Sequence, residues 1–193
     1  MIAIRTAFAS DAPALLEIYA PFILHTAATF ETEVPSIESF SQRITTYQQD
    51  WPWLTYTCDG VIAGYAYATK HRERSAYQWS VESSVYVHDH FQQKGIAMIL
   101  YQKLFAILKY QGCRNVYAGI TLPNDKSVRF HQKCGFSWIA DYNNIGYKLG
   151  RWHTVSWWQL ALNPYDKDPA PVIKFPGVET GFLHSILEKT EKP

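Results

Sequence analysis

The spacing of apolar residues along the chain predicts alternating strands and helices. Apolar residues three or four positions apart predict amphipathic helices over residues 11–20, 37–47, 95–111 and 124–134. Period-two alternation or short apolar runs predict strands over residues 2–5, 53–58, 61–68, 77–87, 116–121, 136–140, 145–149 and 153–162. This order predicts an α/β fold in which helices cover a mixed sheet.

Turn and cap residues predict where several elements end. Asp59-Gly60 stands between two apolar runs and predicts a tight antiparallel hairpin, because both residues accept a positive φ. Pro21 predicts that the first helix ends or kinks near Ala20. Ser36 and Asn124 precede the second and fourth helices as side-chain caps.

Length and composition favour one globular core. The chain has 193 residues, of which 47% are hydrophobic, so it can bury ample apolar surface. We expect a single domain over residues 1–162. Residues 163–193 hold five of the ten prolines and form a C-terminal extension, expected to be extended with a short helix near residues 182–187.

Charge and cysteine usage narrow the classes of function. Eighteen Lys and Arg against seventeen Asp and Glu leave a net charge of +1, which argues against nucleic-acid binding. No basic leader and no segment of about 20 apolar residues is found, so we expect no membrane span and no export. Three cysteines without paired spacing favour reduced thiols in the cytoplasm. His88-x-His90 lacks further ligands, and no metal is expected.

Residues 85–97 run from a strand through a polar loop into a helix. The free backbone N–H groups and the dipole of such a helix attract an anion. Gln92-x-x-Gly95-x-Ala97 keeps residues small where the chain would curl around a pyrophosphate, and Gln93 and Lys94 add side-chain donors. The alternative is an ordinary loop whose glycine relieves a turn.

Strand, turn and helix together resemble the acetyl-CoA site of the GNAT superfamily of N-acetyltransferases. Further segments resemble its phosphinothricin acetyltransferase branch in order and spacing, namely residues 30–33, 75–87, 122–131, 146–148 and 152–153. The resemblance spans roughly residues 1–162 and leaves the extension unaccounted for.

The resemblance implies a fold, a cofactor and an assembly. The implied GNAT fold has a mixed, mostly antiparallel central sheet with flanking helices and a splayed strand pair. The implied co-substrate is acetyl-CoA, and a homodimer is expected. The residues implied to bind acetyl-CoA are Val85, Tyr86, Val87, Gln92, Gln93, Lys94, Gly95, Ile96, Ala97 and Asn124.

Two side chains are candidates for proton transfer. Glu82 lies in an aromatic and valine-rich strand, and with the resemblance we expect it to act as general base on the amine; the residue taken alone favours a carboxylate on the sheet surface that faces solvent. His131 lies where the superfamily often carries a tyrosine as general acid, and we assign it that role. The alternative is a hydrogen-bonded core histidine.

Arg72, Arg74 and Tyr77 precede the Glu82 strand and are candidate substrate-binding residues, because guanidinium groups bind carboxylate and phosphinate oxygens. Phe30 is a further candidate for the same pocket. The resemblance implies direct acetyl transfer to the α-amino group of an analogue such as phosphinothricin, methionine sulfone or methionine sulfoximine. Alternatives are another amine (a polyamine, an aminoglycoside or a peptide) and a CoA-binding dimer without catalysis.

Overall fold

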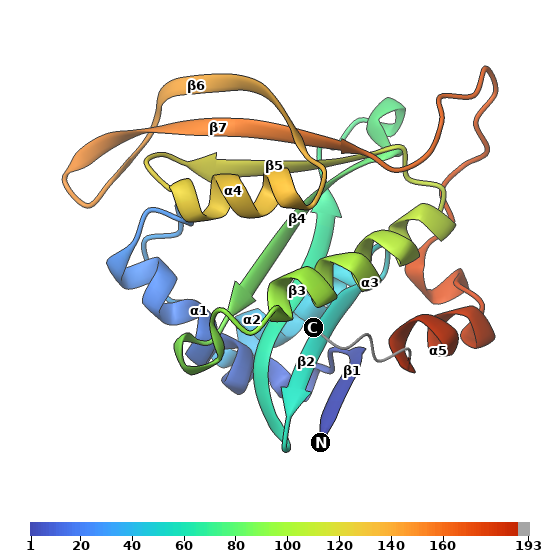
Figure 1. The fold of residues 1–193 in the computed structure, drawn as a ribbon, viewed down its shortest axis with the longest axis horizontal. Helices are drawn as coiled ribbons and strands as arrows, with labels where there is room; N and C mark the ends of the chain where they lie inside the picture. Colours follow the sequence, from blue (N-terminus) through green and yellow to red (C-terminus); the bar gives the residue numbers. More distant parts are fainter. Residues whose placement is uncertain (189–193) are drawn as a thin grey trace.

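The computed structural model of the chain describes residues 1–188. Its sheet has seven strands in the order β1-β2-β3-β4-β5-β7-β6 (Figure 1). β4 and β5 are parallel, and the other neighbouring strands are antiparallel. The predicted mixed, mostly antiparallel sheet is therefore confirmed. The strands are β1 (Ile2–Thr6), β2 (Trp53–Cys58), β3 (Val61–Lys70), β4 (Ser80–Val87), β5 (Asn115–Thr121), β6 (Ser137–Lys148) and β7 (Arg151–Ala161).

Helices cover both faces of the half-sheet formed by β1 to β4, as predicted. The helices are α1 (Ala12–His25), α2 (Ile37–Tyr47), α3 (Ile96–Tyr110), α4 (Asp125–Lys133) and α5 (Thr180–Glu188). Short 3-10 turns occupy Ala9–Asp11, Ser75–Tyr77, Asp89–Phe91 and Phe175–Gly177. Among the described residues, no helix is long and apolar enough to cross a membrane.

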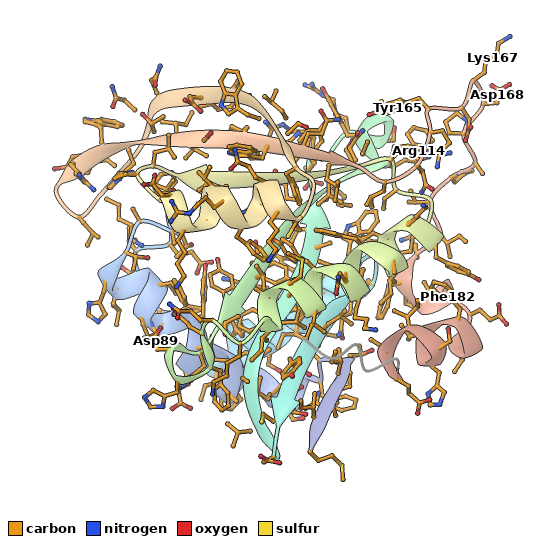
Figure 2. All side chains as sticks on the ribbon, viewed as in Figure 1. Asp89, Arg114, Tyr165, Lys167, Asp168 and Phe182 are labelled. Carbon is orange, nitrogen blue, oxygen red and sulfur yellow. The ribbon has the colours of Figure 1, made fainter. Side chains whose placement is uncertain are left out.

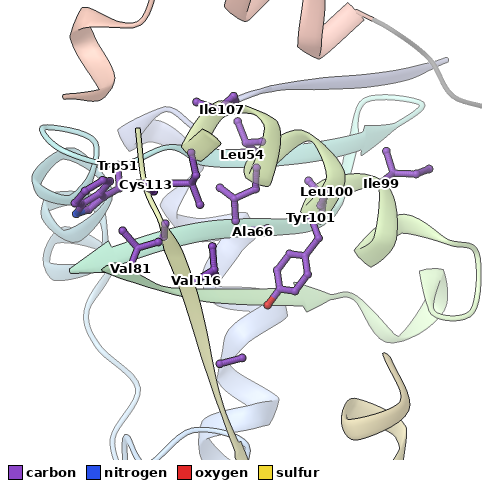
Figure 3. Packing of buried hydrophobic residues seen from close by; sticks show 14 of the residues in the cluster. Trp51, Leu54, Ala66, Val81, Ile99, Leu100, Tyr101, Ile107, Cys113 and Val116 are labelled. Carbon is purple, nitrogen blue, oxygen red and sulfur yellow. The ribbon is translucent and has the colours of Figure 1, made fainter. Parts of the chain in front are cut away.

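Alternation along the strands separates two apolar clusters. Leu54 and Ala66 belong to the cluster that includes α3, whereas their neighbours Trp53 and Tyr65 belong to the one that includes α1 and α2. Figure 3 shows Leu100 and Ile107 of α3 above β2 and β3. Both faces of these strands are thus buried, which makes this half of the sheet a rigid support.

The predicted caps and turns are largely confirmed. Asp59 and Gly60 adopt φ angles of 50° and 82° in the β2–β3 hairpin. The Ser36 hydroxyl accepts a hydrogen bond from the Ser39 N–H at 3.1 Å, and the Asn124 side-chain oxygen Oδ1 accepts one from the Ser127 N–H at 3.1 Å. These side chains satisfy backbone donors that a helix leaves free at its first turn.

Three predicted element boundaries are wrong. α1 continues past Pro21 to His25. Pro21 has no N–H to donate to the Glu17 carbonyl oxygen, but both residues are exposed to solvent, so this loss does not end the helix. β4 begins at Ser80 rather than at residue 77, since Ser75–Tyr77 forms a 3-10 turn. The strands predicted at 136–140 and 145–149 form one strand, β6, interrupted by irregularities in its pairing with β7.

The C-terminal extension packs onto the rest of the molecule. Phe175 and Val178 are buried in the same cluster as α3, and Phe182 stacks on Tyr110 with ring centroids 4.2 Å apart. Arg114 pairs with Asp166 at 2.5 Å, in the region where Figure 2 labels Arg114 beside the extension. α5 confirms the predicted short helix. Residues 189–193 of the predicted extension lie outside the described residues.

Phe175→Ala should lower the free energy of unfolding by about 3 kcal/mol, because it removes a buried ring and leaves a cavity. Ile173→Ala is the matched control, since Ile173 lies in the same segment with an exposed side chain, and it should cost less than about 1 kcal/mol. Urea denaturation of both variants measures the difference. Equal stability would show that the extension does not contribute to the core.

Candidate active site

Two central strands part in the middle of the sheet. β4 and β5 pair through Ser80–Asn115, Val81–Val116 and Glu82–Tyr117, and no pair follows. β4 stays paired with β3 as far as Val87, and β5 stays paired with β7 as far as Thr121. Figure 1 shows the two strands diverging. The edge of β4 beyond Glu82 is therefore free to bond an extended ligand.

A tight turn connects β4 to α3. Gln93 and Gly95 have φ angles of 62° and 75°, and α3 begins directly after Gly95 with no side-chain cap. Lys126 of α4 donates to the Gln92 side-chain oxygen at 2.6 Å, so a cation stands beside these uncapped N–H groups. Figure 2 shows Asp89 at the outer edge of the turn. This arrangement suits a phosphate-bearing ligand.

A cavity of about 450 Å³ lies between the parted strands and reaches this turn. The structure places nine of the ten predicted acetyl-CoA residues on its wall. Lys94 is absent from the lining, and its ammonium group stands over the Phe91 ring at 4.9 Å. The nine are Val85, Tyr86, Val87, Gln92, Gln93, Gly95, Ile96, Ala97 and Asn124.

The cavity passes through the sheet. Ser83 hydrogen-bonds to Tyr101 of α3, so it faces that side, and strand alternation places Ser84 on the opposite face. Both residues line the cavity, as do Phe22 of α1 and Ser127 of α4. A ligand in the gap is therefore reachable from both faces of the sheet.

His131 lies on the wall of the cavity and is buried. Its Nδ1 contacts the Ser127 carbonyl oxygen at 2.8 Å, and its Nε2 contacts the Tyr101 hydroxyl at 3.4 Å. Since a carbonyl only accepts, Nδ1 carries the proton. Burial lowers the pKa of His131 and outweighs the Ser127 hydrogen bond, which raises it. The imidazole is therefore neutral at pH 7.

Glu82 lies on the other face of β4, two residues before Ser84. Two residues of a strand span about 7 Å, so the Glu82 carboxylate stands beside the cavity without lining it. Its Oε1 is 2.9 Å from Nδ1 of His71. The ring of His71 stacks on Tyr117 of β5. The carboxylate is thus held next to the point where the strands part.

Phe30 lies in the loop between α1 and α2 and packs on β6. Its ring occupies the space where a side chain at Gly146 would begin, 2.5 Å from the nearest ring carbon, so any larger residue there would displace the ring. The Lys148 ammonium group donates to the Thr29 carbonyl oxygen at 2.7 Å and holds the loop on the strand. The predicted pocket residue Phe30 is consequently part of the junction between this loop and β6.

The other predicted substrate residues lie in the β3–β4 connection. Tyr77 faces His71, with ring centroids 6.4 Å apart. Arg72 and Arg74 line a second hollow of about 420 Å³, to which Lys174 and Val172 of the extension contribute. The structure does not place these arginines on the wall of the first cavity.

Several residues of the site are missed by sequence reasoning. Lys126, Ser127 and Tyr101 line the cavity, His71 contacts Glu82, and the Trp157 ring meets the His71 ring edge-on. Lys126 and Ser127 stand within a segment that carries the resemblance, which is a signal that could have identified them. His71 stands in the charged run 70–74, whose composition gives no sign of its contact with Glu82.

Comparisons with known proteins give a consistent assignment. The acetyltransferase (GNAT) domain family matches residues 4–157. A phosphinothricin N-acetyltransferase of Streptomyces viridochromogenes is 38% identical over 158 residues, which cover 82% of this chain and 86% of the relative. An L-methionine sulfoximine/L-methionine sulfone acetyltransferase of Salmonella typhimurium is 32% identical, with 84% and 95% covered.

A solved structure has the same architecture. It is an acetyltransferase of Salmonella typhimurium with its cofactor acetyl-CoA, and it superposes with a TM-score of 0.84 at 32% identity. The match covers 88% of this chain and 99% of that chain. The fold described above is therefore shared with a protein whose structure holds acetyl-CoA.

Replacing His131 should change how stability depends on pH. Because burial lowers the pKa of His131 in the folded protein, the unfolded chain binds more protons below its ordinary pKa of about 6.5. The wild-type free energy of unfolding should therefore fall as pH drops below about 6.5, and this part of the fall should be missing in His131→Gln. Denaturation between pH 5 and pH 8 (roughly the range of histidine titration) measures it.

His25→Gln is the control, because His25 is exposed. This variant should retain the wild-type loss of stability in acid. An identical pH dependence of wild type and His131→Gln would contradict the buried neutral state of His131.

Proposed function

The chain belongs to the GNAT family of N-acetyltransferases, and on this premise we propose that it transfers an acetyl group from acetyl-CoA directly to the α-amino group of a small amino-acid analogue. The proposed acceptors are of the phosphinothricin, methionine sulfone or methionine sulfoximine type, the substrates named for the relatives. The observation that carries the proposal is the cavity between β4 and β5, with Glu82 at its margin.

The residues of the cavity fit acetyl-CoA. The uncapped start of α3, with Lys126 beside it, suits the pyrophosphate, and the free edge of β4 around Val85 and Val87 suits the amide groups of the pantetheine arm. Asn124 lines the same cavity while its side chain caps α4. When bound, acetyl-CoA supplies an activated acetyl group as a thioester.

Glu82 is proposed as the general base. An α-amino group is mostly protonated at neutral pH, and it attacks a thioester only after losing a proton. The Glu82 carboxylate is partly exposed, stands beside the gap and accepts this proton directly or through a water molecule. Burial raises the pKa of Cys113 to about 12 and that of Cys134 to about 11, so both thiols stay protonated. A protonated thiol is a poor nucleophile, which disfavours a route through an acyl group on either cysteine.

His131 is proposed as the general acid toward the departing sulfur. It stands on the cavity wall, and Nδ1 is already bonded to Ser127, so the ring, neutral at pH 7, donates a proton from Nε2 only after taking one up there from water. Burial lowers the pKa of His131, which makes the doubly protonated ring a stronger acid than a free imidazolium. The neighbouring Tyr101 hydroxyl, 3.4 Å from Nε2, keeps the ring oriented.

Arg72, Arg74, Tyr77 and Phe30 are proposed to select the acceptor. The carboxylates in the hollow that holds the two arginines have other partners, because Glu73 pairs with Lys70 and Asp50 pairs with Lys174. Within residues 1–188, neither Arg72 nor Arg74 forms an ion pair. Two guanidinium groups without a carboxylate partner favour an anionic acceptor and disfavour a polyamine or an aminoglycoside.

Free-thiol release tests the activity and its acceptor. The purified protein is incubated with acetyl-CoA and, in turn, phosphinothricin, methionine sulfone, methionine sulfoximine, spermidine, an aminoglycoside and a peptide. We expect release with the first three. Release with the cationic amines would assign the alternative acceptor class, and binding of CoA without release would support the non-catalytic dimer.

Glu82→Gln should lower kcat at neutral pH by about 10²-fold or more, and the loss should shrink at higher pH as free amine accumulates. Glu17→Gln is the matched control, because Glu17 is an exposed glutamate of α1 away from the cavity, and it should leave the rate unchanged. An unchanged pH–rate profile for Glu82→Gln would remove the base from the proposal.

A homodimer through β6 and β7 is also proposed. These strands and their turn expose seven large apolar side chains, an unusual density for one hairpin. Aromatic residues of this kind are enriched in protein interfaces. The seven are Trp138, Ile139, Tyr142, Ile145, Tyr147, Leu149 and Trp152.

Trp152→Asp should convert the dimer to a monomer, because it places a charge among these apolar side chains. Val61→Asp is the control, since Val61 is exposed in the distant β2–β3 hairpin and should leave the dimer intact. Sedimentation equilibrium measures the mass. A wild-type protein with the mass of one chain would contradict the dimer.

We further propose that the protein resides in the cytoplasm and that its domain ends at residue 162, where the C-terminal extension begins. The free thiols of Cys58, Cys113 and Cys134 support a reducing compartment.

A further inference from the structure

His71 directly follows β3 and stands two residues after Thr69, which pairs with the proposed base Glu82. Its Nδ1 is 2.9 Å from Oε1 of Glu82, a normal length for a hydrogen bond to a carboxylate. The two side chains are partly shielded from water, with 15% of His71 and 33% of Glu82 exposed. In this setting a hydrogen bond to a charged group is stronger than at a fully wet surface.

The His71 ring has several contacts besides the one with Glu82. The ring stacks on Tyr117 with centroids 4.5 Å apart and planes 24° from parallel, and the Trp157 ring meets it edge-on at 6.0 Å. The His71 backbone N–H also donates to the Ser80 carbonyl oxygen at 3.4 Å. His71 thus contacts β4, β5 and β7 in addition to the Glu82 carboxylate.

The groups that face His71 leave Nδ1 as the donor to Glu82. Glu82 of β4 is its recorded anionic partner, and the cationic neighbours Lys70 and Arg72 flank it in sequence. The phenols that face it are Tyr77 and Tyr117; burial raises the pKa of Tyr117, so that phenol carries no charge. A carboxylate oxygen accepts hydrogen bonds, so Nδ1–H to Oε1 is the hydrogen bond that satisfies both groups.

We propose that His71 is a positioning residue for Glu82: its Nδ1–H donates to Oε1, fixes the carboxylate beside the gap and leaves Oε2 to receive the proton of the acceptor amine. The proton moves from the ammonium nitrogen to Oε2, the lone pair stays on the nitrogen, and His71 keeps its own proton throughout. This inference rests on the proposed function, because it assigns Glu82 as the base.

Two variants separate the hydrogen bond from the stacking. His71→Phe retains an aromatic ring for Tyr117 but removes the donor, whereas His71→Asn retains a donor near the position of Nδ1 but removes the ring. Losing a donor to the ionised carboxylate disfavours the ionised form. His71→Phe should therefore lower kcat/KM at neutral pH about tenfold and move the rising limb of the kcat/KM profile up by about one pH unit.

His71→Asn should retain the wild-type position of that limb. A shift in His71→Asn with none in His71→Phe would show that only the stacked ring matters and would overturn the inference. Unchanged limbs in both variants would overturn it as well. If His71→Phe does not fold, the ¹⁵N chemical shifts of the wild-type imidazole decide: a proton on Nδ1 at neutral pH supports the inference, and an unprotonated Nδ1 overturns it.

Glu82→Gln distinguishes failure of this inference from failure of the proposed function. If wild type releases no thiol with any acceptor, or if Glu82→Gln retains the wild-type profile, the proposed function fails. If Glu82→Gln loses activity while His71→Phe retains the wild-type limb, the inference about His71 fails alone. The double variant should lose no more than Glu82→Gln, because His71 acts through the carboxylate.

Discussion

The site depends on the end of pairing between β4 and β5 after Glu82. Buried backbone N–H and C=O groups require partners, and each unsatisfied group costs free energy comparable to a lost hydrogen bond. The outer edges of both strands are already bonded, to β3 and to β7, so neither strand can turn to another neighbour. The gap therefore presents a strand edge whose missing partner must come from water or from a ligand, which is a backbone-encoded binding site.

A hydrogen-bonded series of side chains lines one face of this gap. Ser83 of β4 donates to the Tyr101 hydroxyl, which contacts His131 of α4, so a hydrogen-bonded series runs from strand to helix to helix alongside the opening. Burial raises the pKa of Tyr101 and lowers that of His131, and both effects keep the groups uncharged. A neutral, fully packed wall is compatible with a cavity, whereas buried charges there would demand counterions.

The parts of the molecule that the sequence predicts are those set by local patterns. Period-two and helical spacing, the Asp59-Gly60 turn, the Asn124 cap and the turn around Gly95 depend on residues close in sequence, and they predict all the main elements and the part of the cavity wall around the β4–α3 turn. Pro21 misleads because the outcome depends on whether the residue four positions earlier is buried, which is a tertiary property. β6 misleads because a bulged strand loses the regular alternation by which it is identified.

The contacts that escape prediction depend on register. His71 meets Glu82 because β3 and β4 pair Thr69 with Glu82, so the residue that follows β3 lies beside that carboxylate. A one-residue slip would place Glu82 on the other face of the sheet, and a sequence without a structure does not specify that register. Likewise, nothing in the proline-rich composition of residues 163–193 indicates that Phe175 enters the core, because such composition is typical of unpacked chain.

The sheet separates the two proposed proton transfers. Glu82 lies on the face of Ser84 and Tyr86, His131 lies against the face of Ser83, and the cavity joins the faces through the gap. An amine approaching from the Glu82 side and a thiolate leaving on the His131 side do not compete for one protonatable group, so different side chains take the proton from the amine and deliver a proton to the sulfur. Such a division requires both substrates to be bound together across the strands, which agrees with direct transfer and needs no covalent intermediate on the protein.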